Sequence, residues 1–226
     1  MGALDRGKRV GSPMTEHDRT ALFDRWSETY DRSVLDESGV HEGYDAVLET
    51  VVRTAEIQPG KRVLDLGIGT GNLALRFVAL GCAVWGVDFS LAMLAKARTK
   101  LPEVTLVQAD LRGEWPPADS ASALTGPFDR IVSTYVLHEF SLDHKVALLR
   151  RLAGCSLGPE GRIVIGDISF ESVQARTDAG ADHWDEEEHY WAADETRAAC
   201  TPAGLHFTYS QVSSCGGVYF FWAEGG

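Results

Sequence analysis

The stretch V-L-D-L-G-I-G-T-G-N at residues 63–72 decides the fold that we predict for this chain. Its apolar first half, with Asp65 inside it, indicates a buried parallel strand, and the amphipathic run after it predicts a helix. Between them, alternating glycines predict a tight turn. Glycines let a ligand approach the backbone closely, and a helix N-terminus leaves N–H groups free to bind polar groups. We therefore predict a nucleoside-binding corner around Gly67, Gly69 and Gly71.

The spacing of these glycines narrows the class of ligand. A dinucleotide fingerprint, G-x-G-x-x-G, needs a glycine at position 72, where this chain has Asn72. About 20 residues further on, the second predicted strand ends in Asp88, where an acceptor for the ribose hydroxyls is expected. The third predicted strand ends at Asp110. Each of these three successive strands ends in a glycine turn or a carboxylate at the same edge of the sheet. This arrangement predicts a bound nucleoside.

At these residues the sequence resembles a known family. The series V-L-D-L-G-x-G-T-G-N, then G-V-D-F-S with Met93, then Q-A-D-L, resembles the cofactor signature of class I S-adenosylmethionine (SAM)-dependent methyltransferases over residues 61–165. The resemblance implies that Asp65 and the three glycines surround the methionine moiety and that Asp88 binds the ribose. It also implies further cofactor contacts, chiefly to the adenine, from Phe89, Met93, Asp110, Leu111 and Thr134.

Length and net charge limit the classes of protein to which this chain can belong. The chain has 226 residues and a formal net charge of −12. This length fits one domain, which we expect at residues 16–226 after a disordered tail at residues 1–15. The negative charge argues against nucleic-acid binding and favours a small-molecule acceptor. With no C-x-x-C pair, no membrane-spanning segment and no signal peptide in the sequence, we expect a cytoplasmic monomer or homodimer without a membrane partner.

A helical cap is expected before the first strand, over about residues 16–58. Four apolar or aromatic residues share one side of its first helix: Leu22, Phe23, Trp26 and Tyr30. The order W-S-E-T-Y-D-R-S-V is similar to an N-terminal segment of many methyltransferases that folds over the cofactor. This resemblance implies that Tyr30 binds the methionine carboxylate or lines the methyl-transfer pocket, with Trp26 beside the acceptor. Core packing is the alternative for both side chains.

The fourth predicted strand, residues 128–134, leads into His138 and Glu139. The carboxyl ends of strands in an open α/β sheet face the ligand crevice, so both side chains are candidates for chemistry, with His138 the first candidate for a general base. A structural role is the alternative for a lone histidine. Asp167, which ends the fifth strand, is a further candidate for contact with the acceptor. The tetrapeptide Asn-Pro-Pro-Tyr of many DNA and glutamine methyltransferases is replaced here by Ser-Thr-Tyr-Val, which disfavours those classes.

Residues 183–191, H-W-D-E-E-E-H-Y-W, have the most unusual local composition in the chain. Histidine and carboxylates together can bind a metal, but the sequence shows no convergent ligand spacing, and we expect no metal. We expect instead a flap whose glutamates face water and whose aromatic side chains face the acceptor pocket. These aromatic residues are Trp184, Tyr190 and Trp191.

The end of the chain completes the predicted fold. Two β-rich runs, residues 205–212 and 218–222, predict a closing hairpin, which matches the antiparallel last strand of class I methyltransferases and which dehydrogenase folds usually lack. The predicted fold class is α/β: a single Rossmann-like, doubly wound, seven-stranded sheet that is mostly parallel with an antiparallel last strand.

The chain resembles the YrrT-like bacterial methyltransferases in its W-x-x-T-Y-D start and its late D-E-E-E-H-Y run. This resemblance implies transfer of a methyl group from SAM to a small molecule, with S-adenosylhomocysteine (SAH) as the product, and it names no acceptor. A protein that binds SAM or SAH without turnover is one alternative. An NAD(P)-linked oxidoreductase is another, and Asn72 and the closing hairpin count against it.

Overall fold

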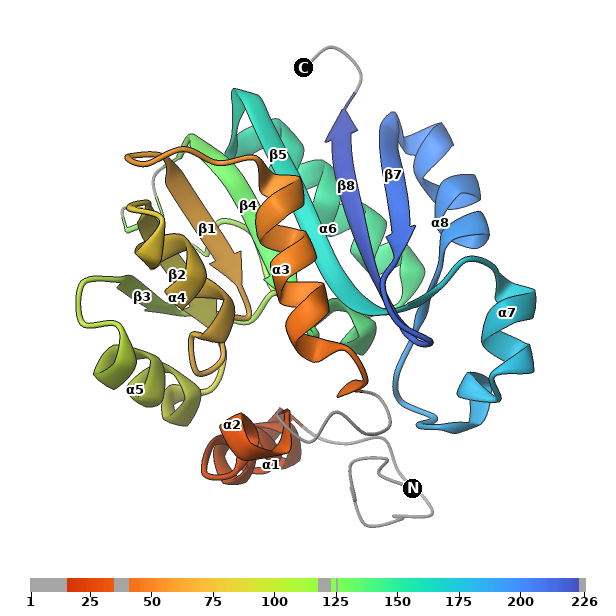
Figure 1. The fold of residues 1–226 in the computed structure, drawn as a ribbon, viewed down its shortest axis with the longest axis horizontal. Coiled ribbons are helices and arrows are strands. Elements are labelled where there is room, and N and C mark those ends of the chain that lie inside the picture. The colour runs from red at the N-terminus through yellow and green to blue at the C-terminus, as the bar shows by residue number, and fades with distance from the viewer. Residues whose placement is uncertain (1–15, 35–40, 118–122, 125, 224–226) are drawn as a thin grey trace.

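A computed structural model of the chain describes residues 16–34, 41–117, 123–124 and 126–223 (Figure 1). The tail predicted at residues 1–15 lies outside these residues. None of the helices in the described part of the chain combines the length and the apolarity that crossing a membrane requires.

The centre of the fold is a sheet in the strand order β3-β2-β1-β4-β5-β8-β7. Every pair in this order is parallel except the two pairs that β8 makes, with β5 and β7. The predicted seven-stranded sheet with an antiparallel last strand is therefore confirmed. An eighth, two-residue strand, β6, pairs with the end of β5 and was not predicted. The strands are β1 Arg62–Leu66, β2 Ala83–Asp88, β3 Thr105–Gln108, β4 Phe128–Thr134, β5 Leu157–Phe170, β6 Trp191–Ala192, β7 Leu205–Gln211 and β8 Gly216–Ala223.

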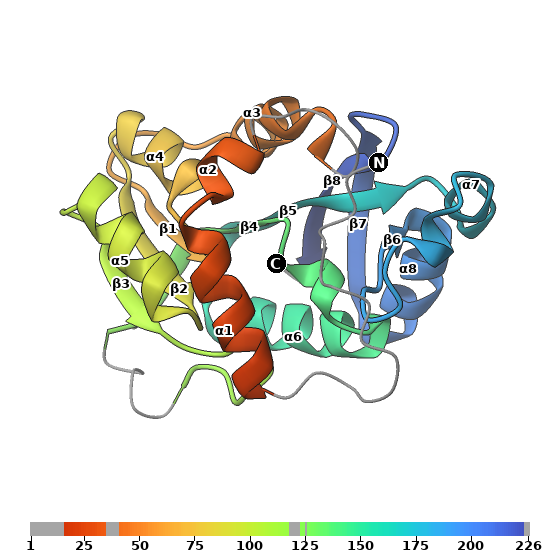
Figure 2. The same cartoon turned by 90° about the horizontal axis from the view of Figure 1, so that it is seen from below.

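Helices cover both faces of the sheet, as expected for a doubly wound fold (Figures 1 and 2). The helices α3, α4 and α5 lie on one face, and α6 and α8 lie on the other. The α-helices are α1 Glu16–Ser27, α2 Tyr30–Ser33, α3 Tyr44–Ala55, α4 Asn72–Ala79, α5 Leu91–Lys100, α6 Leu142–Cys155, α7 Val173–Asp178 and α8 Ala193–Cys200. The described residues also include the 3₁₀ turns η3 Leu137–Glu139, η4 Ala181–His183 and η5 Thr201–Ala203.

Serine side chains cap two of the helices that flank the site. The hydroxyls of Ser90 and Ser141 accept hydrogen bonds from backbone N–H groups in the first turns of α5 and α6. Helix α8 begins at Ala193 without a side-chain cap. The Asp194 carboxylate accepts the backbone N–H of Val173 at 3.0 Å, which joins α8 to α7.

Two large clusters of apolar residues lie on the two sides of the sheet, and a smaller third cluster lies around the end of β5. Trp115 is buried in one cluster, and its Nε1 donates to the hydroxyl of Ser156 at 2.9 Å. Its indole N–H is satisfied inside the core, so Trp115 is a packing residue.

The N-terminal helices α1 and α2 lie beyond the carboxyl ends of the parallel strands, where α1 contacts α5 (Figures 1 and 2). The Ser90 hydroxyl donates to Asp24 of α1 at 2.7 Å, and Phe23 packs edge-to-face on Phe89 with ring centroids 4.9 Å apart. The third helix of this N-terminal region, α3, packs on the sheet face against β5. Of the helices described before β1, α1 and α2 are therefore the two that lie across the strand ends, where they can cover a ligand.

Candidate functional site

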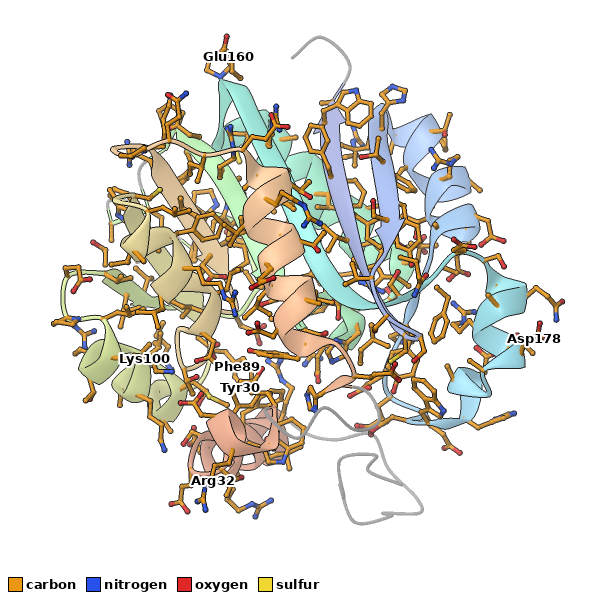
Figure 3. All side chains as sticks on the ribbon, viewed as in Figure 1. Tyr30, Arg32, Phe89, Lys100, Glu160 and Asp178 are labelled. Atoms are coloured by element: carbon orange, nitrogen blue, oxygen red, sulfur yellow. The ribbon has the colours of Figure 1, made fainter. Side chains whose placement is uncertain are left out.

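A cleft opens where the strands end and the N-terminal helices cross them. Its walls come from α1 and α2, the glycine turn after β1, and the ends of β2 and β4. Tyr30 and Phe89, labelled below the sheet in Figure 3, both line this cleft. The predicted site residues that line the cleft are Trp26, Tyr30, Asp65, Gly67, Gly69, Asp88, Phe89, Met93, Asp110, Leu111, Thr134, His138 and Glu139.

The glycine turn between β1 and α4 requires glycine at each of its three positions. Gly67, Gly69 and Gly71 have φ angles of 69°, 54° and 90°, a region that other residues rarely adopt. Their surroundings differ: a Cβ on Gly71 would crowd Leu101, whereas a Cβ on Gly69 would meet nothing within 4 Å. Gly71 does not line the cleft, so it positions α4, and Gly69 leaves room for a ligand.

Asp88 ends β2 with its carboxylate turned toward this turn. It accepts the backbone N–H groups of Gly69 and Ser90, each at 2.9 Å. Burial raises the pKa of Asp88 to about 6, although these backbone hydrogen bonds and the charge of Arg19 lower it. The orientation of this carboxylate is thus fixed at the carboxyl ends of β1 and β2, where it can accept hydrogen bonds from ligand hydroxyls.

Asp65 lies in the cleft beside Asp88 and is 1% exposed. Burial, with the charge of Asp88 as the next cause, raises the pKa of Asp65 to about 8. Its Oδ2 atom has no hydrogen-bond partner in the described part of the chain. Because a buried polar atom is ordinarily paired, this oxygen fits a ligand that brings a cation or an N–H donor, such as the ammonium group of SAM.

Arg19, which sequence reasoning missed, connects α1 to residues that follow β2 and β3 in the cleft. Its guanidinium forms an ion pair with Asp110 and lies 4.0 Å from the centroid of the Phe89 ring. The expected contact of Asp110 with adenine is therefore shared with an ion pair inside the protein. The two groups are 91 residues apart in the sequence, so no local pattern could have paired them.

His138 and Asp167 form a buried pair at the other end of the cleft. The Nδ1 atom of His138 lies 2.6 Å from a carboxylate oxygen of Asp167. Asp167 also accepts the backbone N–H of His138 at 3.0 Å and the indole N–H of Trp191 at 3.1 Å. Asp167 itself is fully buried and does not line the cleft, so the expected contact with the acceptor becomes a positioning contact with His138.

The carboxylates around His138 control its protonation. Burial alone would lower the pKa of His138, but the charge and hydrogen bond of Asp167, with smaller contributions from Glu188 and Glu139, raise it to about 9. The imidazolium in turn holds the pKa of Asp167 below its usual range despite complete burial. Since Nδ1 is occupied by Asp167, Nε2 is the atom left to exchange a proton with a ligand.

The flap expected at residues 183–191 is packed differently from the prediction. Trp184, Tyr190 and Trp191 do not line the cleft. Trp191 is 1% exposed and sits in the core, because β6 pairs with β5, and Tyr190 packs edge-to-face on Trp184 with centroids 5.7 Å apart. The backbone N–H of His189 donates to the carbonyl of His138 at 2.7 Å, which brings this segment against the end of β4.

Aromatic residues beyond the predicted site residues also line the cleft: Phe23, His41, Tyr44, Tyr135 and Phe140. Tyr44 and Tyr135 are stacked with ring centroids 5.1 Å apart. Tyr135 has a φ of 55°, an uncommon conformation for a bulky residue that is typical of functional sites, and its hydroxyl is buried with no partner in the described chain. Its place in the Ser-Thr-Tyr-Val tetrapeptide was the sequence signal that could have identified it.

Known proteins are similar to this chain in sequence. A family model described as a methyltransferase domain matches residues 63–161, which contain the glycine turn, Asp88 and His138. The uncharacterized methyltransferase OB1106 of Oceanobacillus iheyensis is 34% identical over 159 residues, 69% of this chain and 69% of that protein. The uncharacterized methyltransferase YrrT of Bacillus subtilis is 34% identical over 160 residues, 68% and 69% of the two chains. This protein belongs to the YrrT-like methyltransferase family.

Solved structures share the fold of this methyltransferase. A DhpI–SAH complex superposes with a TM-score of 0.72 at 16% identity, over 96% of this chain and 100% of the other. The magnesium protoporphyrin IX methyltransferase ChlM of Synechocystis PCC 6803, with bound SAH, gives a TM-score of 0.63 at 18% identity, over 90% and 99% of the two chains. These structures share the class I methyltransferase fold.

Proposed function

We propose that the protein transfers the methyl group of SAM to a small-molecule acceptor and releases SAH. The observation that carries this proposal is the pair Asp65 and Asp88, which face the glycine turn across one cleft, with an unpaired buried oxygen on Asp65. The same cleft reaches His138, so a nucleoside at one end and a proton acceptor at the other share a single space. Solved structures that share this fold contain bound SAH, and they support SAM as the cofactor.

The cleft residues fit the parts of SAM. Asp88 would accept the ribose hydroxyls, Asp65 would face the ammonium group, and Phe89 and Met93 would enclose the adenine. Gly67 and Gly69 would admit the methionine chain close to the backbone. When bound, SAM supplies a methyl group activated by its sulfonium.

The protein's own contributions are alignment, exclusion of water and proton transfer. The helices α1 and α2 close one side of the cleft and hold the acceptor in line with the methyl group. His138 accepts the proton that the acceptor loses, through Nε2. Asp167 orients the imidazole through Nδ1 and stabilises its charged form. Tyr30 and Trp26 line the transfer pocket beside these groups.

Label transfer tests this proposal directly. We expect that the purified protein, incubated with a metabolite extract and isotopically marked SAM, gives at least one small molecule heavier by a single labelled methyl group. Mass spectrometry of the extract measures this gain, and heat-denatured protein is the control. A protein that binds SAM but labels nothing in extracts from several growth conditions would be a binder without turnover.

The raised pKa of Asp65 predicts that SAM binding depends on pH. Below its pKa of about 8, the carboxyl group of Asp65 is protonated. A cation beside Asp65 stabilises the ionised carboxylate, so SAM binding must release this proton. We expect affinity for SAM to rise with pH between about pH 5.5 and 7.5, by at most about tenfold per unit, with protons released on binding. Calorimetry in buffers of different ionisation enthalpy measures both quantities.

Asp65→Asn removes the titrating group, so its SAM affinity should be weaker and should change less with pH. Asp178→Asn, on the exposed helix α7, is the matched control and should keep the full dependence. An equal pH dependence in the wild type and Asp65→Asn would show that Asp65 does not face the cationic part of the cofactor.

A further inference from the structure

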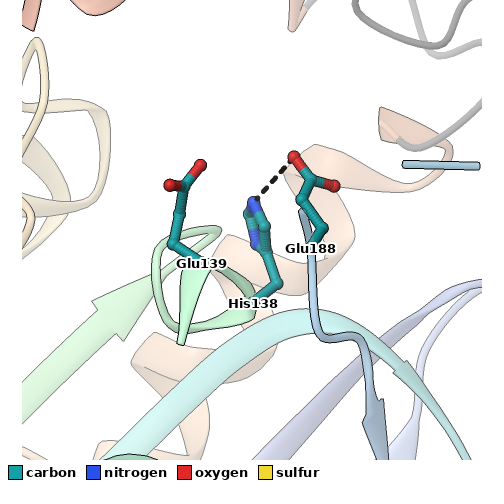
Figure 4. Close-up of side chains that lie close together, drawn as sticks. All are labelled: His138, Glu139 and Glu188. Atoms are coloured by element: carbon teal, nitrogen blue, oxygen red, sulfur yellow. Dashed lines mark ion pairs between the residues drawn. The ribbon is translucent and has the colours of Figure 1, made fainter. Parts of the chain in front are cut away.

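The charges around His138 are already matched within the protein. Figure 4 shows Glu188 facing the imidazole, with Nε2 of His138 3.8 Å from a carboxylate oxygen of Glu188. Asp167 holds the other ring nitrogen, and the guanidinium of Arg112 lies 3.4 Å from the carboxylate of Glu139. Each of these groups has an opposite charge beside it, so this cluster does not indicate a further ligand.

Arg19 differs from these groups, because it is a buried cation with an unused donor. Its side chain is 7% exposed and lines the cleft from α1. One terminal nitrogen of the guanidinium donates to Asp110, but the Nε–H group has no hydrogen-bond partner in the described part of the chain. Buried N–H groups are ordinarily paired, and an unpaired one costs stability. The unused donor therefore indicates an acceptor that a ligand brings.

The neighbours of Arg19 indicate which part of the ligand it meets. Its guanidinium lies 4.0 Å from the centroid of the Phe89 ring and forms an ion pair with Asp110. The proposed function assigns Phe89 to the adenine of the cofactor. The Asp110 side chain remains 30% exposed, so its carboxylate can accept a further hydrogen bond from a ligand. Arg19 and Asp110 are therefore placed together beside the expected position of the base.

The Arg19–Asp110 pair offers a hydrogen-bond donor next to an acceptor. A guanidinium only donates hydrogen bonds, and an ionised carboxylate only accepts them. Adenine has the complementary order, because its N6 amino group donates while the ring nitrogens on either side, N1 and N7, accept. Hypoxanthine carries an oxygen in place of the amino group, and that oxygen would face the Asp110 carboxylate, acceptor against acceptor. The pair therefore favours adenine over a 6-oxopurine.

We propose that Arg19 is a specificity-determining residue for the purine base of the cofactor. Its guanidinium donates to N1 or N7 of adenine, while Asp110 accepts from the N6 amino group. This inference rests on the proposed function, because it requires SAM or SAH in the cleft. Arg19 belongs to α1, so recognition of the base depends on the N-terminal helix as well as on the strand ends.

Binding of SAH analogues tests this inference without turnover. The probes are SAH, its 1-deaza and 7-deaza analogues, in which C–H replaces one ring nitrogen, and S-inosylhomocysteine, in which oxygen replaces the amino group. Calorimetric titration measures each affinity. We expect the wild type to bind SAH at least about tenfold more tightly than S-inosylhomocysteine and than one of the two deaza analogues. The analogue that binds weakly identifies the nitrogen that Arg19 contacts.

Arg19→Met removes the donor but keeps the apolar part of the side chain. It should weaken SAH binding at least about tenfold and leave the affinity for the sensitive deaza analogue within about twofold of the wild type. Arg19→Lys keeps a charge beside Asp110 without the planar fork, so its loss of SAH affinity should be smaller, with the same pattern. Arg25→Met, at an exposed position of α1, is the matched control and should leave every affinity unchanged. Melting temperatures report folding, and Arg19→Lys replaces Arg19→Met in the test if the latter does not fold.

Three results would overturn this inference. The first is an equal loss of affinity for SAH and for both deaza analogues in Arg19→Met, which would make Arg19 only a structural link between α1 and Asp110. The second is an affinity of Arg19→Met for SAH that equals or exceeds that of the wild type. The third is equal binding of all the probes by the wild type. Failure of the proposed function looks different, because the wild type would then bind neither SAM nor SAH, or would bind them and transfer no label.

Discussion

Replacement of Asp88 by alanine is expected to weaken SAM binding by about 100-fold or more. The Asp88 carboxylate is held by the backbone N–H groups of Gly69 and Ser90, and its free lone pairs face the cleft. Hydrogen bonds from two ribose hydroxyls to one charged acceptor would each contribute about 1.5 to 3 kcal/mol. The substitution removes both and leaves the N–H of Gly69 without its acceptor. Calorimetric titration with SAM or SAH measures the loss.

Two further variants separate this loss from a loss of folding. Asp88→Asn keeps the shape of the side chain but replaces one acceptor oxygen by a donor, so it should also bind SAM weakly while its melting temperature stays nearer to that of the wild type. Asp178→Ala removes an exposed carboxylate on α7 and should bind SAM normally. If the folded Asp88→Ala variant has an affinity for SAM within about threefold of that of the wild type, the cofactor does not lie across the carboxyl ends of β1 and β2.

The sequence predicted those parts of the site that depend on neighbouring residues. The glycine turn and the carboxylate that ends β2 are each determined within a few positions of the chain. The order of the strands then follows, because consecutive strand–helix units in a parallel sheet have few arrangements. For this reason Asp65, Asp88 and Phe89 reach one cleft, although each was identified from its own short motif.

Residues whose role depends on distant contacts were harder to predict. Composition alone suggested that Trp191 faces a pocket, but its pairing in β6 with Ser169 and Phe170 of β5 turns the indole into the core. Asp167 ends up behind His138 because β5 continues past the point where β4 ends. Glu188 was grouped with solvent-facing glutamates, and only the folded chain brings it to His138. The prediction that no metal is needed stays a prediction.

Replacement of His138 by glutamine is expected to lower turnover by about 100-fold or more while SAM affinity changes little. The acceptor is the one identified by label transfer. His138 follows β4 whereas Asp88 ends β2, and because Asp167 occupies Nδ1 of His138, Nε2 is the atom that takes the proton. Glutamine fills similar space but cannot take the proton. Steady-state kinetics measures turnover, and calorimetry measures SAM binding; His183→Gln, at an exposed position in η4, should leave both unchanged.

The pH profile distinguishes a base from a merely structural histidine. The raised pKa of about 9 keeps His138 protonated at neutral pH, so kcat/KM for the acceptor should rise with pH and level off near that value. Burial and the partner Asp167 act in opposite directions on this pKa, and Asp167→Asn removes only the part that raises it. In Asp167→Asn the rise should therefore shift to lower pH, along with a lower maximum rate. A structural role for the pair would lower the rate at every pH equally and leave the midpoint unchanged.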